Sequence, residues 1–231
     1  MKESAHSSAV LFDMDGVLVD VTDSYRKAIQ ETVEFFTGTK AEPEEIQEYK
    51  QKGGYNNDWD LTQAIIAKRG KTPPRVEVVQ KFQELYLGNE GTLGFIENEK
   101  WLLPKPQLET LRKEHRLGIV TGRPKEETVY ILRKFGVESF FDAVVAMEDY
   151  PPEKAKPDQL PIRLALEKLG MQEAVYVGDS VDDIASAKGA GVRAFGCIPP
   201  QVSASNLREL LREKGAEKIL EKISDITEAL K

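Results

Sequence analysis

Two aspartates, Asp13 and Asp15, follow the apolar run at residues 10–12 and are followed by Gly16. Consecutive apolar residues are typical of a strand that is buried on both faces of a parallel sheet. Such a strand ends at the carboxyl edge of the sheet, where open α/β folds bind ligands. Neighbouring carboxylates repel each other, so this pair indicates a bridging cation or a carboxyl group that holds a proton for catalysis. From these residues alone, the alternative is an acidic turn after a strand.

A second acidic group follows the apolar run at residues 174–178 and contains Asp179, Asp182 and Asp183. Asp179 directly follows the predicted strand and is the better candidate for a metal ligand. Asp183 lies one helical turn later and could bind the metal directly, act through water, or orient a lysine. Acidic residues at a helix start also interact favourably with the helix dipole, which is our interpretation of Asp182.

A hydroxyl group, a glycine and a lysine lie between the two acidic groups. Thr121 and Gly122 follow the apolar run at residues 117–120. The hydroxyl of Thr121 and the N–H of Gly122 would both suit a bound anion at a helix start, although a helix cap would use the same threonine. Lys156 precedes Pro157, which restricts its backbone, and we favour it over Lys154 as the cation of the site.

In this order, the four segments resemble the motifs of the haloacid dehalogenase superfamily of phosphohydrolases. The resemblance runs from about residue 10 to about residue 194. It is to subfamily I, whose members carry a helical C1 cap, and in particular to phosphoglycolate phosphatases. The resemblance implies that Asp13 is a nucleophile that forms an aspartyl-phosphate, and that Asp15 carries the proton to the leaving group and from water. Thr121 and Lys156 would complete the catalytic set.

The resemblance also implies a magnesium ion and a set of phosphate contacts. Magnesium prefers oxygen ligands, and the implied ones come from Asp13, the backbone carbonyl of Asp15, Asp179 and Asp183. The expected phosphate or substrate contacts are Thr121, Lys156 and the backbone N–H groups of Gly16 and Gly122. Gly16 is equally well explained as a plain turn glycine.

The elements that must position these residues alternate between strands and helices. Short apolar runs predict buried strands at 9–12, 117–121, 143–146, 174–178 and 192–198, with helices at 125–135, 159–169 and 181–188 between them. Further helices are predicted from a cap at Ser203 or Ser205 through Lys214 and over 216–229. This βαβ alternation predicts an α/β fold with a Rossmann-like, three-layer core around a parallel sheet.

About 100 residues separate the first strand from the second, far more than one crossover helix needs. We therefore expect a core domain of residues 1–20 and 101–231 and an inserted helical cap domain of residues 21–100. Helices are predicted near 23–36, 44–50, 60–68 and 75–87. In the resembled subfamily this cap chooses the substrate. The loop that contains Gly54, Asn56 and Asn57 could bind a small polar molecule, or it could be a surface turn that leads into a helix cap.

Composition excludes several classes of partner. The formal charge is −7 and 40% of the residues are hydrophobic, so we expect a packed globular protein without a broad surface for nucleic acid or anionic lipid. No stretch approaches 18 apolar residues, and residues 1–8 lack an apolar segment of signal-peptide length, so we expect no membrane partner and a cytoplasmic location. The single cysteine, Cys197, is expected in the core. The sequence leaves the oligomeric state open.

The sequence therefore predicts a magnesium-dependent phosphatase that acts on a small phosphorylated metabolite. A phosphomutase uses the same aspartyl-phosphate and is the nearest enzymatic alternative. A metabolite-binding module that has lost catalysis is the alternative from a different class.

Overall fold

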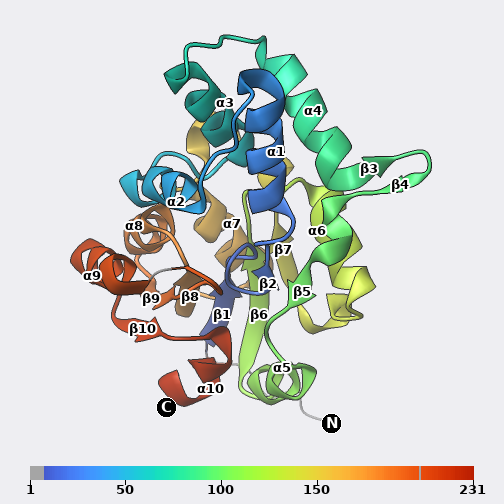
Figure 1. The fold of residues 1–231 in the computed structure, drawn as a ribbon. Helices are drawn as coiled ribbons and strands as arrows, with labels where there is room; N and C mark the ends of the chain where they lie inside the picture. Colours follow the sequence, from blue (N-terminus) through green and yellow to red (C-terminus); the bar gives the residue numbers. More distant parts are fainter. Residues whose placement is uncertain (1–7, 203) are drawn as a thin grey trace. The chain divides into compact units, whose positions relative to one another are not determined.

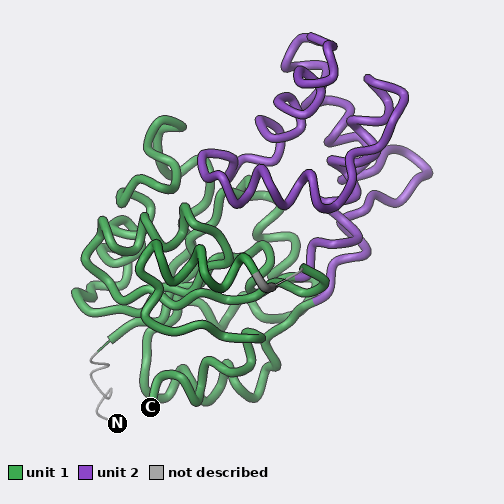
Figure 2. The backbone as a smooth tube through the Cα atoms, turned by 60° about the vertical axis from the view of Figure 1, so that its left-hand side comes forward, with its two compact units in different colours: residues 1–19, 101–231 green, residues 20–100 purple. Residues whose placement is uncertain are grey.

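The structure is a computed structural model that describes residues 8–202 and 204–231. The chain divides into two compact units (Figure 2). The core unit comprises the chain up to Val19 together with Trp101–Lys231, and the inserted unit comprises Asp20–Lys100. Each unit has its own buried apolar residues. Among the described residues, no helix combines the length and the apolar character needed to cross a bilayer.

A six-stranded sheet forms the centre of the core unit, in the order β10-β9-β8-β1-β6-β7, with every adjacent pair parallel (Figure 1). The strands are β1 (Ser8–Phe12), β6 (His115–Val120), β7 (Ala143–Val145), β8 (Ala174–Gly178), β9 (Arg193–Cys197) and β10 (Lys218–Leu220). In the centre of the sheet, Leu11 of β1 is opposite Gly118 on one side and Tyr176 on the other. The strands are nearly continuous in apolar residues because both of their faces are covered.

Helices lie on both faces of this sheet (Figure 1). They are α5 (Lys105–Arg112), α6 (Lys125–Lys134), α7 (Leu160–Leu169), α8 (Val181–Ala190), α9 (Ala204–Lys214) and α10 (Ile226–Ala229). Short 3-10 turns are η2 (Glu138–Phe140), η3 (Met147–Asp149), η4 (Pro152–Lys154) and η5 (Ile223–Asp225). The parallel sheet between two helical layers confirms the predicted Rossmann-like α/β architecture.

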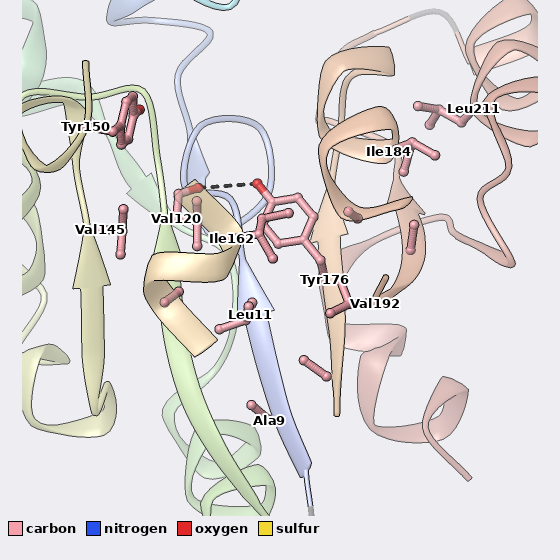
Figure 3. Packing of buried hydrophobic residues seen from close by; sticks show 14 of the residues in the cluster. Ala9, Leu11, Val120, Val145, Tyr150, Ile162, Tyr176, Ile184, Val192 and Leu211 are labelled. Atoms are coloured by element: carbon pink, nitrogen blue, oxygen red, sulfur yellow. Dashed lines mark hydrogen bonds between the residues drawn. The ribbon is translucent and has the colours of Figure 1, made fainter. Parts of the chain in front are cut away.

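The sheet packs against these helices through alternating side chains. On one face, Leu11, Val120 and Tyr176 belong to the same buried cluster as Ile162 of α7 and Ile184 of α8 (Figure 3). The next residue along β1, Phe12, points to the opposite face and meets Phe141 edge-on, with ring centroids 6.4 Å apart. This packing fixes the strand ends from which the polar residues emerge.

The inserted unit is mainly helical. It contains α1 (Tyr25–Thr37), α2 (Pro43–Lys52), α3 (Asp58–Lys68), α4 (Arg75–Leu87), the hairpin β3 (Gly88–Asn89) and β4 (Thr92–Leu93), and η1 (Phe95–Asn98). Tyr25 stacks on Tyr86 with ring centroids 4.2 Å apart. Buried Glu99 accepts hydrogen bonds of 2.9 Å from Ser24 and from the hydroxyl of Tyr86. The short strands β2 (Val19–Asp20) and β5 (Lys100–Trp101), at the two ends of the insertion, pair with each other.

Two predicted element boundaries were wrong. The segment 216–229, predicted as a helix, instead forms β10, η5 and the four-residue α10, because Ile219 and Leu220 extend the sheet beside β9. Helix α8 continues through Gly189 to Ala190, and its C-cap Gly191 adopts the left-handed conformation. Helix α9 runs over Ala204–Lys214, and the predicted cap residue Ser203 lies outside the described residues.

Candidate active site

Three neighbouring strands of the core unit deliver the predicted polar residues to one edge of the sheet. Asp13 follows β1, Thr121 follows β6 and Asp179 follows β8, and β1 lies between the other two strands. Because parallel strands end at the same edge, residues far apart in the sequence meet there. Lys156 enters from the segment between β7 and α7.

The loop after β1 folds back on itself. The N–H groups of Val17, Leu18 and Val19 all donate to the carbonyl of Met14, at 2.9 to 3.3 Å. Gly16 has a φ of 76°, a left-handed conformation that favours glycine.

Gly16 also makes room for the second acidic group. A Cβ at this position would lie 2.4 Å from Oδ2 of Asp179. We expected the N–H of Gly16 to face a phosphoryl group, but it donates instead to the carbonyl of Val19 at 2.9 Å. The described geometry therefore matches a turn glycine that also admits the Asp179 carboxylate.

Asp13 is a buried carboxyl group, with 5% of its surface exposed. Burial raises its pKa to about 7, because removal from water disfavours the charged form. The ammonium of Lys156 opposes this rise, whereas the neighbouring carboxylates of Asp183 and Asp15 add to it. A further cation beside Asp13 would favour its ionised form, which is the form that a nucleophile requires.

Lys156 is the lysine that enters the site. Its side chain is fully buried, and its Nζ donates to Asp13 Oδ1 at 2.9 Å and to Asp183 Oδ1 at 2.6 Å. Burial alone would lower its pKa, but the charges of Asp13 and Asp183 raise the pKa of Lys156 well above its usual value, so the ammonium stays charged. Lys154, by contrast, has a side chain that is 52% exposed and pairs with Asp158.

Asp183 is held by five hydrogen bonds. Its Oδ1 accepts from Lys156 and from the hydroxyl of Tyr176 at 2.9 Å. Its Oδ2 accepts from the backbone N–H groups of Asp179 and Ser180 and from the Ser180 hydroxyl at 2.7 Å. Burial would raise the pKa of Asp183, but the charge of Lys156 and these hydrogen bonds hold it below its usual value. Since both oxygens are already engaged, the geometry favours orientation of Lys156 over direct metal binding among the roles that we considered.

Three carboxylates nonetheless gather at one point. Asp13, Asp179 and Asp183 each offer an oxygen, and these oxygens all lie within 4.8 Å of one another. Such a set of hard oxygen donors fits a divalent cation. The raised pKa of Asp13 agrees with this fit, because a carboxyl group that is hard to ionise alone becomes a good ligand next to a positive charge. The buried acidic cluster could therefore hold a metal ion.

Asp15 forms an ion pair that the sequence analysis missed. Nε and Nη2 of Arg123 donate to Asp15 Oδ1 at 2.8 and 2.5 Å, and the Arg123 side chain is fully buried. Arg123 directly precedes Pro124, the N-cap of α6, where the helix dipole disfavours a cation. A cation at a helix start needs a carboxylate partner. The position of Arg123 before Pro124 could therefore have indicated an ion pair from the sequence alone.

Thr121 is almost completely buried. Its hydroxyl oxygen accepts the N–H of Arg123 at 3.1 Å, and its backbone carbonyl accepts the hydroxyl of Tyr150 at 3.0 Å. Thr121 therefore organises the turn before α6 but does not cap the helix, because the N-cap of α6 is Pro124 and no side chain caps it. A hydroxyl group that accepts in this way can still donate its own proton to an anion. Gly122, the next residue, lies in the same turn and is partly buried.

The candidate substrate residues Gly54, Asn56 and Asn57 lie in the inserted unit, between α2 and α3. Asn57 is the N-cap of α3, and its Oδ1 accepts the N–H groups of Trp59 and Asp60. Asn57 therefore acts as the helix cap that we considered as the alternative. Gly54 is exposed with a φ of 77°, and Asn56 is partly buried.

Comparisons with known proteins found both similar sequences and similar folds. An imidazoleglycerol-phosphate dehydratase from Phytophthora nicotianae is 39% identical over 209 residues, which cover 87% of this chain but only 45% of that protein. A pyrophosphatase PpaX from Bacillus pumilus is 30% identical over 202 residues, or 85% of each chain. The structure of a predicted phosphoglycolate phosphatase from Haemophilus somnus has a TM-score of 0.73 at 20% identity, over 96% of this chain and 97% of that chain, and shares its fold.

A family model covers the insertion and the core unit as far as the end of β9. The model described as haloacid dehalogenase-like hydrolase matches residues 10–197. This match begins just before Asp13 and ends beyond Asp183, so it spans every strand end that carries a polar residue of the site. The chain belongs to the haloacid dehalogenase-like hydrolases.

Proposed function

We propose that the protein is a magnesium-dependent phosphatase that hydrolyses a small phosphate monoester through a covalent phosphate on Asp13. The observation that carries this proposal is the buried Lys156, whose ammonium contacts Asp13 at the carboxyl edge of the sheet. A phosphate ester repels an anionic nucleophile, so positive charge must surround both groups for attack to occur. Lys156 supplies such charge at the nucleophile itself.

In the first step, a carboxylate oxygen of Asp13 attacks phosphorus and the bond from phosphorus to the leaving oxygen breaks. Asp15 gives a proton to that leaving oxygen. The hydroxyl of Thr121 and the ammonium of Lys156 offset the negative charge on the phosphoryl oxygens. Arg123 fixes the carboxyl group of Asp15 so that its position does not depend on the substrate.

In the second step, Asp15 takes a proton from a water molecule, which attacks phosphorus. The bond between phosphorus and the oxygen of Asp13 breaks, and inorganic phosphate leaves with Asp13 restored. A magnesium ion, when bound by Asp13, Asp179 and the backbone carbonyl of Asp15, would supply further positive charge for the phosphoryl group. Asp183 would hold Lys156 in place through its hydrogen bonds.

The inserted unit is the part of the chain that we propose selects the substrate. Its loop residues Gly54 and Asn56 remain candidates for that selection, whereas Asn57 is engaged as a helix cap. The names of the relatives suggest three compounds to test: phosphoglycolate, pyrophosphate and imidazoleglycerol phosphate. All three are small polar molecules that carry a phosphoryl group.

The test is phosphate release from these compounds and from p-nitrophenyl phosphate, with magnesium or with EDTA. Wild type is compared with Asp13→Asn and with a matched control, Asp60→Asn, whose carboxylate forms an exposed ion pair with Arg75 in the inserted unit. We expect metal-dependent release from wild type and the control and no release from Asp13→Asn. Equal release by Asp13→Asn would exclude Asp13 as nucleophile. Isomerisation of a sugar phosphate in a parallel incubation would indicate the mutase, and phosphate binding without turnover would indicate the binding module.

A further inference from the structure

Tyr176 occupies a position in β8 where the strand pattern calls for an aliphatic residue. The strand reads Ala-Val-Tyr-Val-Gly, and every one of its residues is buried. A tyrosine that is buried this deeply must find a partner for its hydroxyl group. Tyr176 lies three residues before Asp179, so its hydroxyl approaches the same edge of the sheet as the site.

The aromatic ring of Tyr176 is held by the apolar core. Leu11 lies directly opposite Tyr176 in the pairing of β1 with β8, and the surrounding cluster includes Ile162 and Ile184 (Figure 3). None of the Tyr176 side chain is accessible to solvent. A ring that is packed on all sides has one orientation, so its hydroxyl oxygen is a fixed point in the protein.

The hydroxyl of Tyr176 contacts both partners of a buried ion pair. It accepts a hydrogen bond from Lys156 Nζ at 3.0 Å and can donate to Asp183 Oδ1 at 2.9 Å. The carbonyl of Val120 lies 3.3 Å from the same hydroxyl (Figure 3) and 3.5 Å from Lys156 Nζ. Tyr176, Lys156 and Asp183 thus form a closed triangle of hydrogen bonds.

This triangle of hydrogen bonds sets the directions of the N–H bonds of Lys156. An ammonium group has three hydrogens, and the three closest acceptors of Lys156 are Asp183, Asp13 and Tyr176. A flexible lysine between two carboxylates could rotate or move toward either of them. The hydroxyl of Tyr176 fixes the direction of one N–H bond and thereby directs another toward Asp13.

We propose that Tyr176 is a positioning residue that holds the ammonium of Lys156 between Asp183 and the nucleophile Asp13. The role rests on the proposed function, because it matters for turnover only if Asp13 is the nucleophile. Tyr176 touches neither the phosphoryl group nor the metal. It acts on the ammonium of Lys156 directly and through the hydrogen bond to Asp183.

Tyr176→Phe removes the hydroxyl group and keeps the ring. A matched control is Tyr150→Phe, which also removes one buried hydroxyl that donates to a carbonyl at the end of β6, that of Thr121, without a hydrogen bond to Lys156. Tyr150→Phe loses one buried hydrogen bond, and Tyr176→Phe loses those with Lys156, Asp183 and Val120, so both variants carry a cost to folding. They differ in whether Lys156 loses a partner.

We expect Tyr176→Phe to lower kcat on the order of tenfold, as for the loss of one hydrogen bond to a charged group. The magnesium concentration for half-maximal activity should stay unchanged, because Asp13 and Asp179 are untouched. Tyr150→Phe should change kcat much less. Equal losses of kcat in the two variants, or a parallel loss of magnesium affinity in Tyr176→Phe, would overturn the proposal.

A second readout does not depend on turnover. The rate of reductive methylation of Lys156, followed by mass spectrometry, should rise in Tyr176→Phe and not in Tyr150→Phe, with exposed Lys154 as the internal reference. An unchanged rate at Lys156 would also overturn the positioning role. If the wild type releases no phosphate, the proposed function fails, and the methylation rates alone decide this inference. If Tyr176→Phe does not fold, Tyr176→Met keeps a flexible apolar side chain without a hydroxyl and gives the same test.

Discussion

Replacement of Lys156 by methionine tests the central ion pair most directly. Methionine has an unbranched apolar side chain, so it fills the buried space without the charge. The matched control is Lys154→Met, two residues earlier, because Lys154 is exposed and pairs only at the surface with Asp158. The two variants make the same chemical change in one segment of the chain.

The structure sets the size of the expected loss. Lys156 is fully buried and contacts Asp13 at 2.9 Å and Asp183 at 2.6 Å. Removing one partner of a buried ion pair destabilises a protein by about 3–5 kcal/mol, because the remaining charge is left unpaired. In a protein of this size, 1 kcal/mol shifts the melting temperature by about 2–4 °C, so Lys156→Met should melt about 6–20 °C below wild type. Lys154→Met should melt close to wild type, since exposed ion pairs contribute little.

The loss of stability in Lys156→Met should increase with pH. Without Lys156, the buried carboxyl groups of Asp13 and Asp183 are harder to ionise in the folded than in the unfolded state, so their folded pKa values lie above their unfolded ones. Such groups destabilise the fold increasingly as pH rises toward the folded pKa, and the penalty disappears when the groups are protonated. The difference between wild type and Lys156→Met should therefore be larger at about pH 8 than at about pH 5.

Thermal melts of the three proteins in EDTA, at both pH values, provide the measurement. EDTA matters because a bound metal would partly replace the missing positive charge. The reasoning is refuted if Lys156→Met and Lys154→Met melt at the same temperature at the higher pH. It is also refuted if the deficit of Lys156→Met does not change with pH.

Three further predictions concern other parts of the core unit. Gly178→Ala would place a Cβ 2.2 Å from the Cβ of Asp183, so we expect it to lose about 1–3 kcal/mol of stability in urea denaturation together with most activity; a stable, fully active variant would contradict this. Burial raises the pKa of Asp13 to about 7, so without metal this group destabilises the fold progressively from about pH 4 to pH 7. Magnesium should consequently raise the melting temperature more at about pH 8 than at about pH 5, whereas an equal gain at both would argue against Asp13 as a ligand. Burial also raises the pKa of the Cys197 thiol, so a disulfide reagent should not react with it until the protein unfolds, and rapid reaction in native buffer would show that the thiol is accessible.

The strand ends of the site were predictable from the sequence because they follow a simple rule. Continuous apolar runs that end in Asp13, Thr121 and Asp179 indicate parallel strands, and parallel strands bring their carboxyl ends together. That rule uses only local pattern and needs no knowledge of side-chain packing. The same reasoning predicted the helical insertion from the distance between the first two strands.

The partners of these residues were harder to predict because they depend on contacts between distant segments. Tyr176 reads as one more residue of an apolar run, and only the packing of β8 shows where its hydroxyl lies. Arg123 reads as part of a charged helix start, yet it is buried against Asp15. The edge strand β10 has only three residues, and its pairing with β9 outweighs the local helical pattern.

The position of the insertion also affects the order in which the protein can fold. Ser8 of β1 pairs with His115 of β6, so the two central strands must close a loop that contains the whole inserted unit. The entropic cost of closing a flexible loop grows with the logarithm of its length, and a loop of this length costs about 4 kcal/mol to close. If the inserted unit folds first, pairing of β2 with β5 joins its ends, and the effective loop shortens to residues 13–18 on one side and 102–114 on the other.

The inserted helices contact segments that are closer in the sequence than β1 and β6 are to each other, and contacts between nearer segments form faster. We therefore expect pulse-labelling hydrogen exchange to protect α1 and α4 before β1, with the reverse order contradicting this pathway. On this pathway the insertion acts as an internal scaffold during synthesis and refolding. Asp13, the proposed nucleophile that follows β1, would then gain its neighbours only in the last stage of assembly.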